Sequence, residues 1–372
     1  MYPLRLRPFR LLSSRSVTLK VFSGGQKVKL LKRRIQIKER HYATRDTNRI
    51  VRPFEWGTSF IAPHANDGDD PRRLLAEYSQ NALAASDEFY ALPSVTDYRL
   101  DGEGLTWTSS IHTPTPENNT AHARFYREST LTGKANDTRR AVVVLPEWNA
   151  QPHGHVQLCH ILTRFGIAAL LMTVPYHGQR RPPELERADH LVSSNIGRTL
   201  QSMRQAVLDT RAAIRWLHEQ GYERIGIMGT SIGSCIGFLA LVHEPLVCTG
   251  VFNHVSGYVA DVAWRGISTA HVRAGFADSV TLDELRRYWL PISPLAYSDK
   301  LKHLPPRPIR FIAARYDLTF PADLSRDAIE GVRNAGHPLD AVWLRCGHYT
   351  LGQSPWKYID GWKIVTFLRK HL

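Results

Sequence analysis

The chain has 372 residues, of which 43% are hydrophobic, enough to bury a core in one large α/β domain with insertions or in two smaller domains. Its longest apolar run, around residues 167–174, is far shorter than the roughly 18 to 20 residues that cross a bilayer, so we expect no transmembrane segment. The net charge of +14 raises the question of nucleic-acid binding, which depends on where the charge lies.

The positive charge is concentrated at the N-terminus. Residues 1–40 hold 12 Lys and Arg and one acid, Glu39, so they carry +11 of the net charge, and the rest of the chain is nearly neutral. A basic segment can contact phosphates or anionic lipid, but it does not make the folded remainder a nucleic-acid-binding domain. The sequence has no zinc-finger spacing, aromatic RNA-binding motif or heptad run, so no specific nucleic-acid partner is expected.

Residues 1–45 are predicted to form a disordered basic tail, because prolines and a glycine pair interrupt any helix there. A mitochondrial presequence over residues 1–40 is the alternative, since the segment is rich in Arg and almost free of acids. The four cysteines are widely spaced and form no CxxC pair, which favours reduced thiols. We therefore expect a cytoplasmic protein, with the mitochondrion as the alternative compartment.

Residues 46–140 are predicted to form an N-terminal extension. A helical spacing of apolar residues covers residues 73–84, and two strand-like runs cover residues 105–112 and 121–126. A turn-rich stretch with two prolines and two asparagines separates these runs. The extension is therefore expected to contain one helix and an antiparallel hairpin.

Residues 141–372 are predicted to form the core domain, because short apolar runs alternate there with amphipathic segments. The apolar runs cover residues 141–145, 167–174, 225–228, 247–252, 309–314 and 341–344. Such runs are typical of strands buried on both faces of a parallel sheet. The helical segments cover residues 155–165, 199–220 and 322–334, and each ends near a glycine. The predicted fold class is α/β: a mostly parallel, doubly wound sheet with helices on both faces.

Residues 253–306 separate the fourth and fifth of these apolar runs and are too long for a simple crossover. The segment is rich in large aromatic residues, which often shape apolar pockets. We interpret it as a small helical lid, with Trp264 and Arg273 as candidate pocket-lining residues. The alternative is an elaborated helix that only packs against the sheet.

The strongest motif is Gly-x-Ser-x-Gly around Ser231, which lies between an apolar strand and a helix-compatible run. A sharp turn from strand to helix exposes the serine hydroxyl above the sheet, and Gly229 and Gly233 allow the helix and strand to approach closely. The motif alone is common by chance. The strand before it and the helix after it favour Ser231 as a nucleophile.

A serine hydroxyl needs a base, and the base needs an acid that fixes its tautomer. Asp317 directly follows the run at residues 309–314, and His348 follows the run at residues 341–344. Both therefore lie at the carboxyl edge of the sheet, where open α/β sheets form their sites. The order Ser231, Asp317, His348 predicts a catalytic triad with His348 as the base.

Other acids and histidines are placed less well. Asp323 and Asp327 fall within a predicted helix, His337 precedes its strand, and His371 lies near the chain end. A cluster of three histidines lacks a carboxylate at metal-ligand spacing, so no metal site is expected; its members are His153, His155 and His160. The oxyanion should bind two backbone N–H groups, which we assign to Ile232 and Trp148.

Residues 141–372 resemble the α/β-hydrolase superfamily of esterases, lipases, thioesterases, peptidases and related enzymes. The resemblance rests on the elbow around Ser231, on Tyr316-Asp317 and on Gly347-His348. It implies the α/β-hydrolase fold. Many relatives carry His-Gly where this chain has Pro146-Glu147, a departure that affects the second oxyanion donor. The sequence at residues 175–178 is similar to a loop that often flanks the pocket, so Tyr176 and His177 are candidate lining residues.

Together these features predict a serine hydrolase that cleaves an ester through an acyl-enzyme, with no metal and no organic cofactor. The expected partner is a small-molecule ester substrate whose identity the sequence does not specify, and the oligomeric state is also unspecified. A peptidase, a thioesterase or an acyltransferase would use the same residues. A catalytically silent binding protein on this fold is the alternative of another class.

Overall fold

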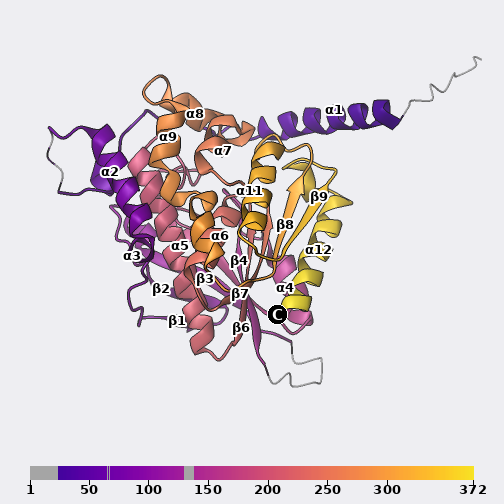
Figure 1. Cartoon of the computed structure of the whole chain (residues 1–372). Helices are drawn as coiled ribbons and strands as arrows, with labels where there is room; N and C mark the ends of the chain where they lie inside the picture. Colours follow the sequence, from indigo (N-terminus) through magenta and orange to yellow (C-terminus); the bar gives the residue numbers. More distant parts are fainter. Residues whose placement is uncertain (1–23, 65, 67, 130–137) are drawn as a thin grey trace, which may run out of the picture.

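The computed structural model describes residues 24–372 apart from residues 65, 67 and 130–137 (Figure 1). The described residues form a nine-stranded sheet with the strand order β1-β2-β3-β5-β4-β6-β7-β8-β9. The strands are β1 (Arg99–Asp101), β2 (Gly104–Thr108), β3 (Thr120–Tyr126), β4 (Arg140–Leu145), β5 (Ala168–Thr173), β6 (Arg224–Thr230), β7 (Val247–Asn253), β8 (Ile309–Ala314) and β9 (Leu339–Leu344). All neighbouring pairs among β4–β9 are parallel.

Helices cover both faces of this sheet. They are α1 (Gly24–Ala43), α2 (Pro71–Ala84), α3 (Ser86–Phe89), α4 (Val156–Arg164), α5 (Ile196–Glu219), α6 (Ile232–His243), α7 (Val259–Arg265), α8 (Ala270–Phe276), α9 (Leu282–Tyr288), α10 (Ser298–Lys302), α11 (Ala322–Asn334) and α12 (Trp356–His371). One core joins the sheet to α5, α6 and α11, and a second core joins it to α4 and α12. The two cores lie on opposite faces of the sheet, because successive side chains of a strand point to opposite faces. Along β4, Val143 faces the first core, and Val142 and Val144 face the second.

The parallel sheet confirms the predicted α/β-hydrolase fold, and each of the six apolar runs overlaps one of the strands β4–β9. The insertion after β7 is helical, with α7, α8, α9 and α10 in its length. The carboxyl ends of β4–β9 lie at the same edge of the sheet, because these strands are parallel. The residues that follow β6, β7, β8 and β9 are therefore brought close together.

The N-terminal extension adds strands to the edge of the same sheet. Strands β1, β2 and β3 form an antiparallel meander, and β3 pairs antiparallel with β5. Ala123 and Phe125 of β3 are buried against the core that contains α5. Residues 46–140 therefore share one sheet and one core with residues 141–372.

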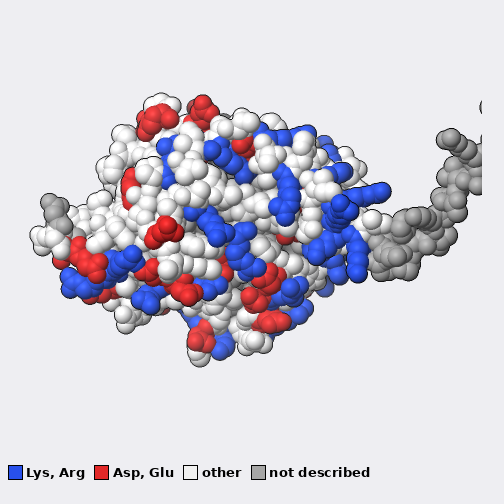
Figure 2. All heavy atoms as spheres, turned by 90° about the horizontal axis from the view of Figure 1, so that it is seen from above, with Lys and Arg blue, Asp and Glu red and all other residues white. Residues whose placement is uncertain are grey.

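Helix α1 departs from the predicted disordered tail over residues 1–45. Residues 24–43 are helical, and the prediction is wrong for them because two side chains, Ile35 and Glu39, find buried positions against the rest of the chain. Among the α1 side chains that the structure describes, from residue 28 onward, six basic ones are exposed: Lys29, Lys32, Arg33, Arg34, Lys38 and Arg40. The helix extends away from the body, and Lys and Arg gather along it (Figures 1 and 2). Residues 1–23, where most of the predicted presequence falls, lie outside the described residues.

No helix within the described part of the chain is both long enough and apolar enough to cross a membrane.

Candidate active site

Ser231 lies at the turn between β6 and α6 with a backbone φ of 56° and ψ of −121°, a strained conformation for a residue with a side chain. The turn is possible because of the two flanking glycines. A Cβ on Gly229 would lie 2.3 Å from the carbonyl oxygen of Gly233, and a Cβ on Gly233 would lie 2.4 Å from that of Leu145. Both contacts are too short for any side chain, so the close strand–helix approach that exposes Ser231 requires glycine at both positions.

Asp317 follows β8 and is held by hydrogen bonds at both carboxylate oxygens. Its Oδ1 accepts the backbone N–H groups of Thr319 and Phe320, each at 2.7 Å. Its Oδ2 lies 2.8 Å from Nδ1 of His254 and 3.1 Å from Nδ1 of His348. Burial alone would raise the pKa of Asp317, but the charge of His348 and the hydrogen bonds from both histidines outweigh burial and hold the pKa well below its usual range. Asp317 is therefore an ionised acceptor.

His348 lies in the loop after β9, where its ring stacks on Phe320 at 5.4 Å between centroids. Burial disfavours its protonated form, but the carboxylate of Asp317 outweighs burial and raises the pKa of His348. Because Asp317 is ionised, Nδ1 of His348 carries the proton and donates it. The Nε2 atom is then free to accept a proton.

His254 is a second histidine at the same carboxylate, and the sequence analysis missed it. It follows β7 directly, with a left-handed φ of 54°, and its ring centroid lies 4.2 Å from that of His348. Burial and the neighbouring charge of His348 lower the pKa of His254, so His348 is the ring that protonates first. The strand-end criterion that located Asp317 and His348 would also have located His254.

Ser231, His254 and His348 line one cavity of about 1420 Å³ at the carboxyl edge of the sheet. Within the described residues, the Ser231 hydroxyl donates no hydrogen bond to either ring. Hydrogen bonds between a nucleophile and its base are often long in unliganded sites and shorten when substrate binds.

The backbone N–H groups of Ile232, directly after Ser231, and of Trp148, in the loop after β4, have no protein acceptor among the described residues. Ile232 is the first residue of α6, so its N–H has no acceptor within the helix. The loop after β4 also exposes Trp148 to the cavity. The neighbouring N–H of Asn149 is already used, because it donates to Nε2 of His177 at 2.8 Å.

His177 supports this loop and also lines the cavity. Its Nδ1 lies 2.9 Å from the carbonyl oxygen of Pro175, so the ring donates there and accepts from Asn149. Burial lowers the pKa of His177 to about 4, which keeps the ring in this neutral form. The Trp148 side chain provides further support, with Nε1 donating to the carbonyl of Ala188 and the indole stacked on His271 of α8.

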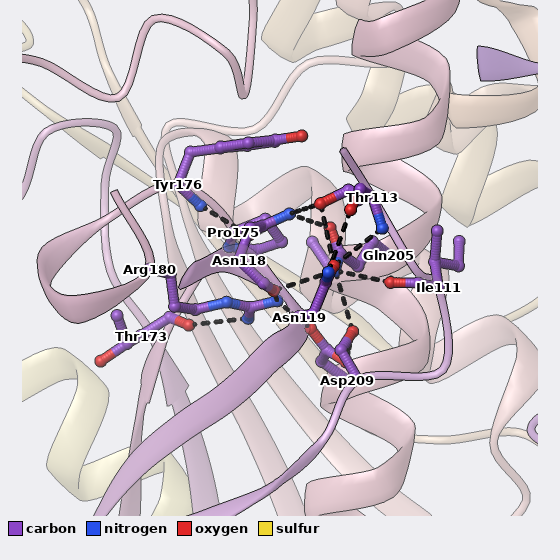
Figure 3. A network of polar contacts seen from close by, with 12 residues as sticks. Ile111, Thr113, Asn118, Asn119, Thr173, Pro175, Tyr176, Arg180, Gln205 and Asp209 are labelled. Carbon is purple, nitrogen blue, oxygen red and sulfur yellow. Dashed lines mark hydrogen bonds and ion pairs between the residues drawn. The ribbon is translucent and has the colours of Figure 1, made fainter. Parts of the chain in front are cut away.

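Tyr176 lines the cavity. The loop that carries Tyr176 is connected to α5 by a buried network of hydrogen bonds and an ion pair (Figure 3). The backbone N–H of Tyr176 donates to Asn118, whose side-chain amide donates to Gln205 of α5 at 2.7 Å. Arg180, fully buried, forms an ion pair of 2.8 Å with Asp209 of α5. This network fixes the loop that carries His177.

Trp264 and Arg273 do not line the cavity, and the prediction that they do is wrong. Trp264 stacks on Phe276 of α8, and the Arg273 guanidinium lies 5.2 Å from the centroid of the Trp264 ring. The insertion reaches the cavity with other residues: Val259, Val262, Ala263, Ser268 and Thr269. Helix α7 thus turns one face to the cavity and Trp264 to α8.

Among the described residues, His254, Asp317 and His348 form a group that could hold a metal ion, with ligand atoms within 4.8 Å of one another. The two Nδ1–H donors and the single acceptor oxygen account for this proximity without an ion. Ser231, Ile232, Trp148 and His348, which is hydrogen-bonded to Asp317, all line one cavity. These are the parts needed for acyl transfer.

Comparison with known proteins agrees with this architecture. Residues 151–330 match the family model described as "Alpha/beta hydrolase domain containing 18". No curated protein sequence matches the chain significantly.

Solved structures that are similar include an acylaminoacyl peptidase of Pyrococcus horikoshii (15% identity, TM-score 0.54) and a puromycin-hydrolyzing peptidase of Mycobacterium tuberculosis (13% identity, TM-score 0.55). The matches cover 77% and 76% of this chain but only 43% and 48% of those proteins. Acetyl xylan esterase 1 of Thermoanaerobacterium sp. JW/SL YS485 has 14% identity and a TM-score of 0.55, with 80% of this chain and 93% of the esterase covered. At these identities the likeness concerns the fold.

Proposed function

We propose that this chain, which has the α/β-hydrolase fold and matches an α/β-hydrolase family model over residues 151–330, is a serine hydrolase that cleaves a carboxylic ester through an acyl-enzyme intermediate. The observation that carries the proposal is the hydrogen bond between His348 and the ionised Asp317 at the cavity that Ser231 lines. An imidazole held by a buried carboxylate in this tautomer is the base that a serine nucleophile needs.

The chemistry follows from these positions. The Ser231 oxygen attacks the substrate carbonyl carbon while Nε2 of His348 removes the hydroxyl proton, and Asp317 stabilises the imidazolium that forms. The N–H groups of Ile232 and Trp148 stabilise the oxyanion. Collapse of the tetrahedral intermediate breaks the bond to the leaving alcohol, which takes the proton from His348. Water then attacks the acyl-enzyme with His348 again as the base, and the acid product and the free serine are released.

The cavity supports a small-molecule ester as the substrate. Its volume of about 1420 Å³ exceeds the range of about 300 to 1,000 Å³ common for ligand pockets, so an extended acyl group or alcohol has room. The part of α7 that faces the cavity is apolar, through Val259, Val262 and Ala263. An ester also has a better leaving group than an amide, which places less demand on proton transfer from His348.

A fluorophosphonate probe and a set of matched substrates test the proposal. The wild-type protein should react with the probe at Ser231, and Ser231→Ala should not react. Esters, thioesters and anilides that share one acyl group should be cleaved fastest as esters. Faster cleavage of the anilide would make the protein a peptidase, and acyl transfer to an added alcohol in preference to water would make it an acyltransferase. No turnover and no labelling of a folded wild-type protein would favour the silent binding protein.

The cytoplasm remains the proposed compartment, with the mitochondrion as the alternative. Cys159, Cys235, Cys248 and Cys346 are all free, which fits a reducing environment. Localisation of the full chain with a C-terminal tag distinguishes the two compartments.

A further inference from the structure

Glu39 of α1 is completely buried beneath the loop that carries His348. One carboxylate oxygen accepts the backbone N–H of Tyr349 at 3.0 Å, and the other accepts that of Thr350 at 2.9 Å. Tyr349 directly follows His348, so Glu39 fixes the backbone next to the imidazole. A side chain of α1 therefore contacts the backbone of the loop that carries the candidate base, about 310 positions later in the sequence.

The loop is shaped to receive this carboxylate. A Cβ on Gly347 would lie 2.3 Å from Cδ of Glu39, so no larger residue fits at position 347 while Glu39 is in place. The N–H of Gly347 donates to the Thr350 hydroxyl at 2.8 Å, which closes the loop around the carboxylate. Tyr42, one turn further along α1, hydrogen-bonds to Gln353 beyond the same loop.

Burying this acid is unfavourable unless it is compensated. Burial raises the pKa of Glu39, and the two backbone N–H donors oppose that rise. An isolated buried carboxylate would be costly, and an apolar side chain at this position would anchor α1 at lower cost. The position therefore calls for a role that only an acceptor can fill, which is to satisfy the two N–H groups of the loop.

We propose that Glu39 is a positioning residue that holds His348 in register with Asp317 and Ser231. The proposal rests on the proposed function, since it assigns Glu39 to the same reaction. It follows that the last turns of α1 belong to the catalytic unit, although the basic face of the helix is exposed.

The charge of Glu39 gives the proposal a distinct signature. Three carboxylates raise the pKa of His348 and so favour its imidazolium form: Asp317, Glu39 and Glu147. The fourth titratable neighbour is His254, whose own protonation the charge of His348 disfavours. Replacing Glu39 with a neutral residue removes one of the favourable charges. The pKa of His348 should then fall, whereas replacing a residue of α1 whose charge does not act on His348 should leave this pKa unchanged.

The experiment compares Glu39→Gln and Glu39→Ala with Arg40→Ala, a matched control at the adjacent exposed position of α1. Two quantities are measured for each protein: the fluorophosphonate labelling rate as a function of pH, and the pKa of His348 by NMR, with His348→Gln used to assign the signal. Glu39→Ala should lower the labelling rate at alkaline pH by roughly 10- to 100-fold, and Glu39→Gln, which retains one acceptor, should lower it less. Both variants should move the midpoint and the His348 pKa to lower pH, while Arg40→Ala matches the wild type.

An unchanged rate and an unchanged His348 pKa in Glu39→Gln would overturn the proposal, and so would equal effects of Arg40→Ala and Glu39→Ala. Glu39→Gln preserves side-chain volume, so it remains informative if Glu39→Ala does not fold. Failure of the proposed function is separate: it would appear as a wild-type protein that the probe does not label at Ser231. In that case the NMR pKa of His348 in Glu39→Gln still decides whether Glu39 acts on this loop.

Discussion

His254 and His348 meet at a single atom, because Nδ1 of each ring lies within hydrogen-bond distance of Oδ2 of Asp317. The other oxygen of Asp317 is occupied by the backbone of Thr319 and Phe320. The two rings therefore compete for the charge on one oxygen. Any group that donates to Oδ2 reduces the ability of Asp317 to stabilise the His348 imidazolium.

Loss of the hydrogen bond from His254 should raise the pKa of His348, because Asp317 would then have one donor fewer. In His254→Ala the acid limb of the activity profile should move to higher pH, the opposite direction from Glu39→Gln. His254→Asn is the matched control, since the Asn amide can donate from a position close to that of Nδ1 and Asn tolerates the left-handed backbone. It should restore the wild-type midpoint. Complete loss of activity in both variants, with His348→Ala still active, would instead make His254 the base.

The wild-type activity should increase with pH through the pKa of His348, because only the neutral ring accepts the Ser231 proton. Asp317 raises that pKa above the usual imidazole value of 6.5, so the midpoint of kcat/KM should lie above 6.5. The profile is measured on a neutral ester, so that substrate ionisation does not contribute. A midpoint well below 6.5 would show that the His348–Asp317 pair does not control the rate.

Asp360, which lines the cavity from α12, should make the free energy of unfolding depend on pH. It is buried on α12, accepts one hydrogen bond from Asn253 at 2.8 Å, and has one oxygen without a partner among the described residues. Burial raises the pKa of Asp360 to about 7. Since the folded pKa is above the unfolded one, its contribution to stability is complete below about pH 4 and is lost as the pH rises through 7.

The free energy of unfolding of the wild type should therefore fall by a few kcal/mol between pH 5 and pH 8 relative to that of Asp360→Asn. Denaturant titrations of both proteins at several pH values measure the difference. Parallel pH curves for the two proteins would show that Asp360 does not titrate in this range.

Substrate selection by the insertion should depend on α7 and not on Trp264. Val262 faces the cavity and Trp264 packs on Phe276, so the two positions predict different effects. Val262→Phe should lower kcat/KM for long acyl chains more than for acetyl esters, with little change in stability. Trp264→Ala should lower stability by about 3 kcal/mol or more and leave the order of substrates unchanged. If Trp264→Ala reorders the substrates and Val262→Phe does not, the cavity is bounded differently from this description.

The sequence predicted the parts of the site that follow local rules. Each strand of the parallel sheet has its own apolar run, and a residue placed directly after such a run must lie at the carboxyl edge; this locates Ser231, Asp317 and His348. Side-chain direction within the insertion has no comparable rule, because its short helices pack on several neighbours. For that reason the sequence pattern wrongly places Trp264 and Arg273 at the cavity, whereas the two side chains pack on each other.

The role of Glu39 depends on a contact that local patterns do not contain. The backbone N–H groups that donate to Glu39 lie about 310 positions away, and the helix that carries it has few apolar residues at a regular period. One signal was present: Glu39 is the single acid among 12 basic residues in the first forty. An isolated acid in such a segment is a reason to expect a specific partner.

The most direct test of the account is identification of the residue that becomes acylated. A slowly hydrolysed activated ester is mixed with the protein, the reaction is quenched with acid, and the modified peptide is identified by mass spectrometry. We predict one acyl group on Ser231, no such adduct in Ser231→Ala, and a loss of turnover of about 10⁴- to 10⁶-fold in Ser231→Ala and His348→Ala. An acyl group on a different residue, or wild-type turnover by Ser231→Ala, would contradict the account.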